Sequence, residues 1–108
     1  MSKYHNKRYG GFDSKKEKAR YEELLLMQRA GMIQGLTRQV RFELIPAQYQ
    51  NGRCILRKTV YVADFTYWQN GKFVVEDVKG YKEGNAYSLY MIKKKLLFQR
   101  YGYLIKET

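Results

Sequence analysis

Cysteine, histidine and proline are nearly missing from this sequence, which has one of each: Cys54, His5 and Pro46. A lone cysteine excludes an internal disulfide and any zinc site built from a cysteine cluster. With a single histidine as well, zinc ligation and catalysis by a Cys–His or Ser–His pair are poorly supported. Aromatic residues, at 16%, are more abundant than in a disordered tail. We therefore expect the 108 residues to fold as one domain.

Negative charge is also scarce, since 10 Asp and Glu face 21 Lys and Arg, which gives a net charge of +11. A small domain with this charge repels itself unless its partner is a polyanion, and nucleic acid is the first candidate. A membrane is not expected as a partner, because no stretch approaches the about eighteen apolar residues of a spanning helix. The N-terminus has no apolar signal core, so we expect a cytoplasmic protein.

The hydrophobic spacing predicts an α+β fold in the order helix, three strands, helix, strand, with a mixed sheet flanked by helices. Residues 1–12 have no period and are expected to form a basic N-terminal arm, followed by one domain at 13–108. Asn51-Gly52 is expected in a loop between the first two strands. We expect the last strand to lie parallel to the third one, through a right-handed crossover. The predicted helices are 15–30 and 87–101, and the predicted strands are 36–45, 54–68, 72–79 and 103–105.

Asn70-Gly71 lies between two β-branched and aromatic runs and is the strongest short-range hairpin signal in the chain. With a two-residue turn, Gln69 faces Lys72, and opposed residues have numbers that add to a constant. This register places Asp64 directly across from Asp77 on one face of the sheet. A longer turn would weaken this prediction.

Strand alternation places Lys79 on the face of the two aspartates, whereas Glu76 and Val78 point to the other face. Both faces are expected to be covered, so two opposed carboxylates there need compensating positive charge. The aspartate face is expected to carry Val60, Val62, Phe73 and Val75, and the opposite face Tyr61, Ala63, Phe65, Val74 and Val78.

Hard oxygen ligands of this kind suit Mg²⁺, with Mn²⁺ as a substitute, and no small-molecule cofactor is expected. A cation held by Asp64 and Asp77 would polarise a phosphodiester, while Lys79 would orient a water or stabilise developing charge. Glu17, in the first turn of the first helix, is the acid best placed to become a further ligand, directly or through a water. The pattern favours a phosphodiesterase.

Asp64 followed by Asp77-Val78-Lys79 on the next strand, with an acid on a preceding helix, resembles the PD-(D/E)XK nuclease superfamily. Ala63 stands where the motif has proline, a common departure that leaves the ligands untouched. More closely, residues 12–17 (FDSKKE), 63–65 (ADF) and 75–80 (VEDVKG) look like a group of small phage-encoded proteins of uncharacterised function assigned to that superfamily. The resemblance covers nearly the whole chain after the arm.

The resemblance implies a restriction-endonuclease-like core in which Asp64, Asp77 and the Val78 carbonyl bind the metal. It also implies that Lys79 is the catalytic lysine and Glu17 the acid of the first helix. DNA is the substrate by the same resemblance. A homodimer follows by analogy if the closest functional relatives are the phage and archaeal Holliday junction resolvases.

Each of these residues also has a simpler interpretation. Asp-x-Lys alone is a weak signal, because solvated ion pairs two residues apart occur on most exposed strands. A glutamate three residues after a cap serine, as at Glu17, often only closes a capping box. Basic residues either bind nucleic acid or only solubilise the chain, and the candidates are Lys3, Lys7, Arg8, Lys93, Lys94 and Lys95. The alternative function is a non-catalytic nucleic-acid-binding module, and a virion structural protein is a distant third.

Overall fold

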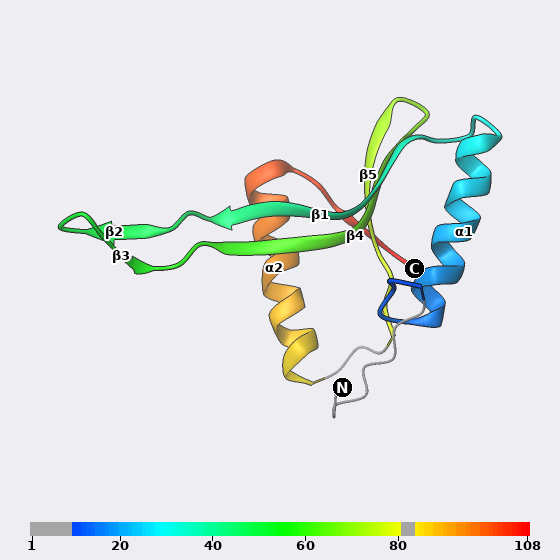
Figure 1. Ribbon diagram of the computed structural model, residues 1–108. Helices are drawn as coiled ribbons and strands as arrows, with labels where there is room; N and C mark the ends of the chain where they lie inside the picture. Colours follow the sequence, from blue (N-terminus) through cyan, green and yellow to red (C-terminus); the bar gives the residue numbers. More distant parts are fainter. Residues whose placement is uncertain (1–9, 81–83) are drawn as a thin grey trace.

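The computed structural model describes residues 10–80 and 84–108. In this part of the chain it has the α+β architecture expected from the sequence, with two helices flanking a mixed sheet (Figure 1). The elements in chain order are α1 (Lys15–Arg29), β1 (Gln34–Ile45), β2 (Gln48–Gln50), β3 (Arg53–Leu56), β4 (Thr59–Gln69), β5 (Lys72–Asp77), α2 (Asn85–Tyr101) and β6 (Ile105–Glu107).

The larger sheet has the strand order β1-β4-β5-β6. β1, β4 and β5 are antiparallel neighbours, whereas β6 returns through α2 and pairs with β5 in parallel. The predicted parallel crossover is confirmed. In Figure 1, α2 passes behind β1 and β4, and α1 lies at the opposite end of the molecule from the tip of β2 and β3.

Two hydrophobic clusters hold the helices to the sheet. The α1-side core is Phe12, Leu24, Ile33, Phe65 and Tyr67, and the α2-side core is Leu44, Tyr61, Ala63, Val75, Tyr90, Leu97 and Ile105. Phe12, which the sequence placed in the N-terminal arm, is 5% exposed, and its ring lies 5.2 Å from that of Tyr21. This end of the predicted arm is thus part of the core, while residues 1–9 lie outside the described part of the chain.

The prediction of one strand over 54–68 is wrong. The chain leaves extended pairing at Arg57 and Lys58, so that β3 belongs to a separate two-stranded ribbon with β2. Asn51-Gly52, which we expected in a loop, is the turn of this ribbon, with φ of 51° and 77°. Both central residues of a type I′ turn need positive φ, and Asn-Gly meets that need at low cost.

Along β4, the odd-numbered side chains pass from the α2-side core to the α1-side core at Asp64. Tyr61 lies in the α2-side core and Phe65 in the α1-side core, although residues an even number apart share one face of a regular strand. Across from this point, Gln39 of β1 has a φ of 53°, which locally reorients the strand. The expectation that Tyr61 and Phe65 share a face is therefore wrong. Val62, expected to be covered, is 37% exposed.

Candidate active site

The two aspartates meet where β4 and β5 begin to separate. The observed pairs run from Gln69↔Lys72 to Phe65↔Glu76, so the two-residue turn and its register are confirmed. The next residues along this register are Asp64 and Asp77, whose side chains share a hydrogen bond. The Asn-Gly turn thus sets the position of the carboxylate pair.

Asp64 is a half-buried carboxyl with an altered acidity. Burial, followed by the hydrogen bond and the charge of Asp77, raises the pKa of Asp64 to about 8. The Val78 backbone N–H donates to Oδ2 of Asp64 at 2.8 Å and opposes this rise, while the charge of Glu17 adds to it. Near neutral pH, the pair therefore favours uptake of a positive charge, either a proton or a cation.

Asp77 is buried and held by two donors on the same oxygen. Lys79 Nζ lies 3.1 Å from Oδ2 of Asp77, and the Tyr61 hydroxyl donates to that atom at 2.9 Å. Lys79 Nζ also lies 3.3 Å from the centre of the Tyr90 ring, in a cation–π contact. Backbone bonds between β5 and the C-terminus, from Thr108 N to Asp77 O at 3.0 Å, hold the segment in place.

Tyr61 and Tyr90 were missed by the sequence reasoning. Alternation along β4 assigns Tyr61 to the face away from Asp77, and only the reorientation at Asp64 brings it back. Tyr90 is a core residue of α2 whose ring happens to lie under Lys79. Burial and the nearby Asp77 carboxylate raise the pKa of Tyr61 above its ordinary value, so its hydroxyl remains a donor.

Glu17 is 5% exposed in the first turn of α1, which is unusual for an acid at a helix start. Its backbone N–H donates to the Ser14 side chain at 3.1 Å, which confirms the predicted cap. Its carboxylate accepts a hydrogen bond from Gln39 Nε2 at 3.4 Å. The side chain therefore reaches toward the sheet, close enough for its charge to act on Asp64.

A metal ion at this position would depend mainly on the two aspartates. Among residues 10–80 and 84–108, no group of three or more His, Cys, Asp or Glu side chains is arranged to hold a metal ion. The donor set nevertheless fits Mg²⁺, which usually takes one or two carboxylates and completes its shell with waters and substrate phosphate. Glu17 fits an outer position, where it would act through a water.

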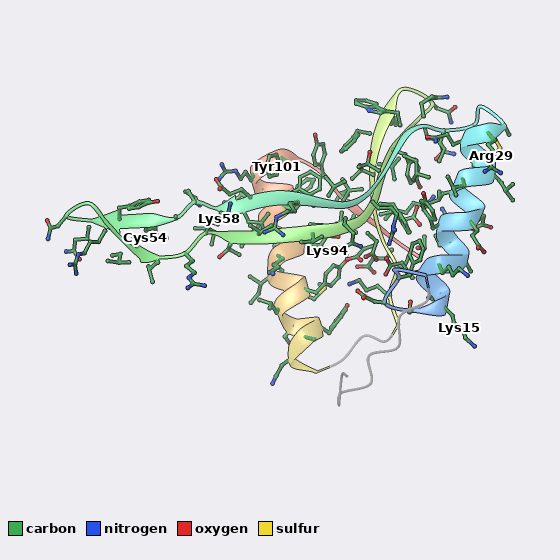
Figure 2. The ribbon with its side chains drawn as sticks, in the orientation of Figure 1. Lys15, Arg29, Cys54, Lys58, Lys94 and Tyr101 are labelled. Carbon is green, nitrogen blue, oxygen red and sulfur yellow. The ribbon has the colours of Figure 1, made fainter. Side chains whose placement is uncertain are left out.

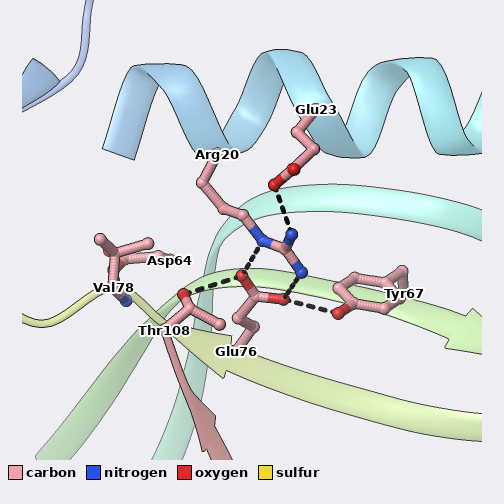
Figure 3. A network of polar contacts seen from close by, with 7 residues as sticks. All are labelled: Arg20, Glu23, Asp64, Tyr67, Glu76, Val78 and Thr108. Carbon is pink, nitrogen blue, oxygen red and sulfur yellow. Dashed lines mark hydrogen bonds and ion pairs between the residues drawn. The ribbon is translucent and has the colours of Figure 1, made fainter. Parts of the chain in front are cut away.

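Glu76 confirms the prediction that it points away from the aspartates. Its fully buried carboxylate receives Arg20 Nε at 2.5 Å and Nη2 at 3.0 Å, the Tyr67 hydroxyl at 2.5 Å and the Thr108 hydroxyl at 3.0 Å (Figure 3). Burial opposes ionisation, but the bonds from Arg20 and Tyr67 outweigh it and lower the pKa of Glu76. Glu23 binds the far side of Arg20 at 2.6 Å. This network fixes α1 to β5 directly beside Asp77.

The predicted basic contacts are only partly described. Lys94 pairs with Glu107 at 3.1 Å, Lys93 is half-buried, and Lys95 is exposed. The remaining candidates, Lys3, Lys7 and Arg8, lie outside the described residues.

These observations define an α+β domain with an opposed aspartate pair, a lysine on one of its oxygens and a buried glutamate nearby. A family model described as "Protein of unknown function (DUF1064)" matches residues 1–107, and the chain belongs to this family. No curated protein and no solved structure matches the chain. Neither described helix has the length and apolar character needed to cross a membrane.

Proposed function

We propose that this protein is a Mg²⁺-dependent endodeoxyribonuclease of the PD-(D/E)XK type. The observation that carries the proposal is the close approach of Asp64 and Asp77, one register position beyond the last observed pair of β4 and β5, with Lys79 Nζ 3.1 Å from Oδ2 of Asp77. The buried carboxylate of Glu76 has one arginine and two hydroxyl donors to itself. The aspartate pair has one lysine for two carboxyls and a raised Asp64 pKa, which suits a site completed by a divalent cation.

The residues around the aspartate pair have separate roles in phosphodiester hydrolysis. A bound Mg²⁺ or Mn²⁺ would polarise the phosphate and lower the pKa of a water. Asp64 and Asp77, with the Val78 carbonyl, would hold the cation. Lys79 is fixed between Asp77 and the Tyr90 ring and stabilises negative charge that develops on the phosphate. Glu17 orients a water from the α1 side.

The substrate is DNA, and a branched form such as a Holliday junction is the finer proposal. A net charge of +11 supports a polyanionic substrate. The branched form rests on the resemblance of the motif to a nuclease superfamily that includes the Holliday junction resolvases. We further propose a homodimer that acts in the cytoplasm, the host cytoplasm if the protein is phage-encoded.

The proposal is tested with a labelled four-way junction, a flap, a linear duplex and a single strand, each incubated with Mg²⁺, with Mn²⁺ and with chelator. Paired, symmetric nicks in the junction that disappear with chelator support a resolvase. Calorimetry provides a readout besides activity, because D64N is expected to abolish Mn²⁺ binding and the exposed control E22Q to retain it. Intact DNA in every reaction contradicts the proposal.

The alternative is a nucleic-acid-binding module without catalysis. The absence of a three-ligand group among the described residues is the observation that favours it. A binding module would hold DNA equally well with and without metal, would cleave none of it, and would bind DNA unchanged in D77A. A nuclease would lose cleavage in D77A and keep binding.

A further inference from the structure

The ribbon formed by residues 46–58 projects from the body, away from both helices (Figure 1). All residues from 48 to 58 are exposed. The exposed side chains include large apolar ones: Tyr49 at 66%, Ile55 at 54% and Leu56 at 56%. A two-stranded ribbon without a covering layer is marginally stable in water, and exposed apolar groups in a cluster mark a contact surface.

The charge of the ribbon is of one sign. Residues 46–58 contain Arg53, Arg57 and Lys58 and no acidic residue, and Arg41 of β1 lies at the base of the ribbon. Within residues 10–80 and 84–108, none of these four cations forms a salt bridge. Several cations of the body are paired instead, since Arg20 faces Glu76, Lys94 faces Glu107 and Arg100 faces Glu43.

Three of the cations gather around one hollow. Arg41, Arg57 and Lys58 line an open depression of about 500 Å³ together with Ala47, Tyr49, Cys54 and Val60. Figure 2 shows Lys58 and Cys54 on the projecting ribbon. A depression lined by several cationic side chains and an aromatic ring can bind phosphates through the cations and place the ring against a sugar or base.

We propose that the ribbon binds the substrate DNA, with its two strands in a groove of the duplex and Arg41, Arg57 and Lys58 on the phosphates. The major groove of B-DNA admits a two-stranded β-ribbon. The charge of the ribbon selects a polyanion over a second copy of this chain, whose own net charge is +11. This inference rests on the proposed function in taking DNA as the partner.

In this arrangement, the ribbon contacts the DNA at a set distance from the two aspartates. Lys58 precedes Asp64 by six positions (64 − 58), and β4 runs between them. At a rise of about 3.3 Å per residue, the contact lies roughly 20 Å from the carboxylates. This corresponds to about six base pairs at 3.4 Å each. One duplex segment can thus reach both places.

The test compares R57Q/K58Q with the control R29Q/K72Q, which removes two exposed cations from outside the ribbon (Arg29 is labelled in Figure 2). Binding of a labelled duplex is measured in chelator over a range of salt concentrations, so that cleavage does not interfere. R57Q/K58Q is expected to weaken binding roughly tenfold and to lower the slope of log affinity against log salt by about 2. Because the ribbon is outside the core, both variants should unfold at the wild-type temperature.

Equal affinity and equal salt slope in the two variants would overturn the ribbon proposal. A second result would also overturn it: R57Q/K58Q binds DNA as wild type does but no longer self-associates in sedimentation. The ribbon would then be an interface between copies of the chain. Cleavage in Mg²⁺ is scored separately. If R57Q/K58Q binds DNA more weakly and no form of the protein cleaves it, the ribbon proposal is supported and the nuclease is rejected. If R57Q/K58Q binds and cleaves DNA as wild type does, the nuclease is supported and the ribbon proposal is rejected.

Discussion

The hydroxyl of Tyr61 donates a hydrogen bond to Oδ2 of Asp77 at 2.9 Å, from a strand position that regular alternation assigns to the other face. The same oxygen faces Lys79 Nζ at 3.1 Å. The tyrosine therefore fixes the orientation of Asp77 together with the lysine. Its position depends on the change of face in β4 at Asp64, so the bend of the strand and the geometry of the carboxylate pair are linked.

Y61F tests this link. The variant keeps the ring in the core and removes the donor, and hydrogen bonds to charged groups contribute about 1.5–3 kcal/mol. We expect cleavage to fall at least about tenfold. Y101F is the matched control, since the Tyr101 hydroxyl donates to the Glu43 carbonyl at 2.8 Å, away from the aspartates. Equal cleavage rates for Y61F and Y101F would contradict a positioning role for Tyr61.

Lys79 is tested by K79M, with K72M as the control at the exposed turn of the same hairpin. Loss of a preorganised group that stabilises developing charge typically costs about 10²–10³ in rate. We predict a loss of this size in single-turnover cleavage for K79M and none for K72M. Mn²⁺ binding should persist in K79M, because both aspartates remain. A K79M rate within twofold of wild type would remove Lys79 from the mechanism.

Glu17 has two separable parts in the structure, a backbone N–H in the helix cap and a carboxylate that reaches toward β1. S14A removes the cap and is expected to lower the free energy of unfolding by about 1 kcal/mol with little effect on cleavage per folded molecule. E17Q keeps the cap and is expected to reduce cleavage strongly. If E17Q cleaves at the wild-type rate, the residue belongs only to the helix start.

Glu76 offers a stability prediction independent of activity. E76Q leaves Arg20 in a site where its side chain is 17% exposed, without a charged partner at β5. Breaking a buried ion pair costs about 3–5 kcal/mol, and the partial exposure of Arg20 places the expected loss near the lower end. E23Q removes the exposed partner of the same arginine and should change the unfolding free energy by less than about 1 kcal/mol. Chemical denaturation of the two variants measures the difference.

The sequence was sufficient for the carboxylate pair because one local signal, Asn70-Gly71, sets the register of a whole hairpin. It also placed Glu76 and Lys79 on opposite faces, since alternation holds along β5. Alternation failed for Tyr61 because β4 changes its core face opposite Gln39, whose positive φ has no signature in the residue type. The ribbon was missed because Arg57 and Lys58 interrupt pairing without a proline or glycine.

The most direct measurement is the rate at which D77N cleaves a labelled four-way junction in saturating Mg²⁺, beside wild type and the exposed control E22Q. We predict metal-dependent cleavage by wild type and E22Q and a loss of at least about a thousandfold in D77N, because the variant removes the carboxylate charge at the centre of the site. Equal rates for D77N and E22Q, or no cleavage of any DNA form by wild type, would contradict a nuclease built on Asp64 and Asp77.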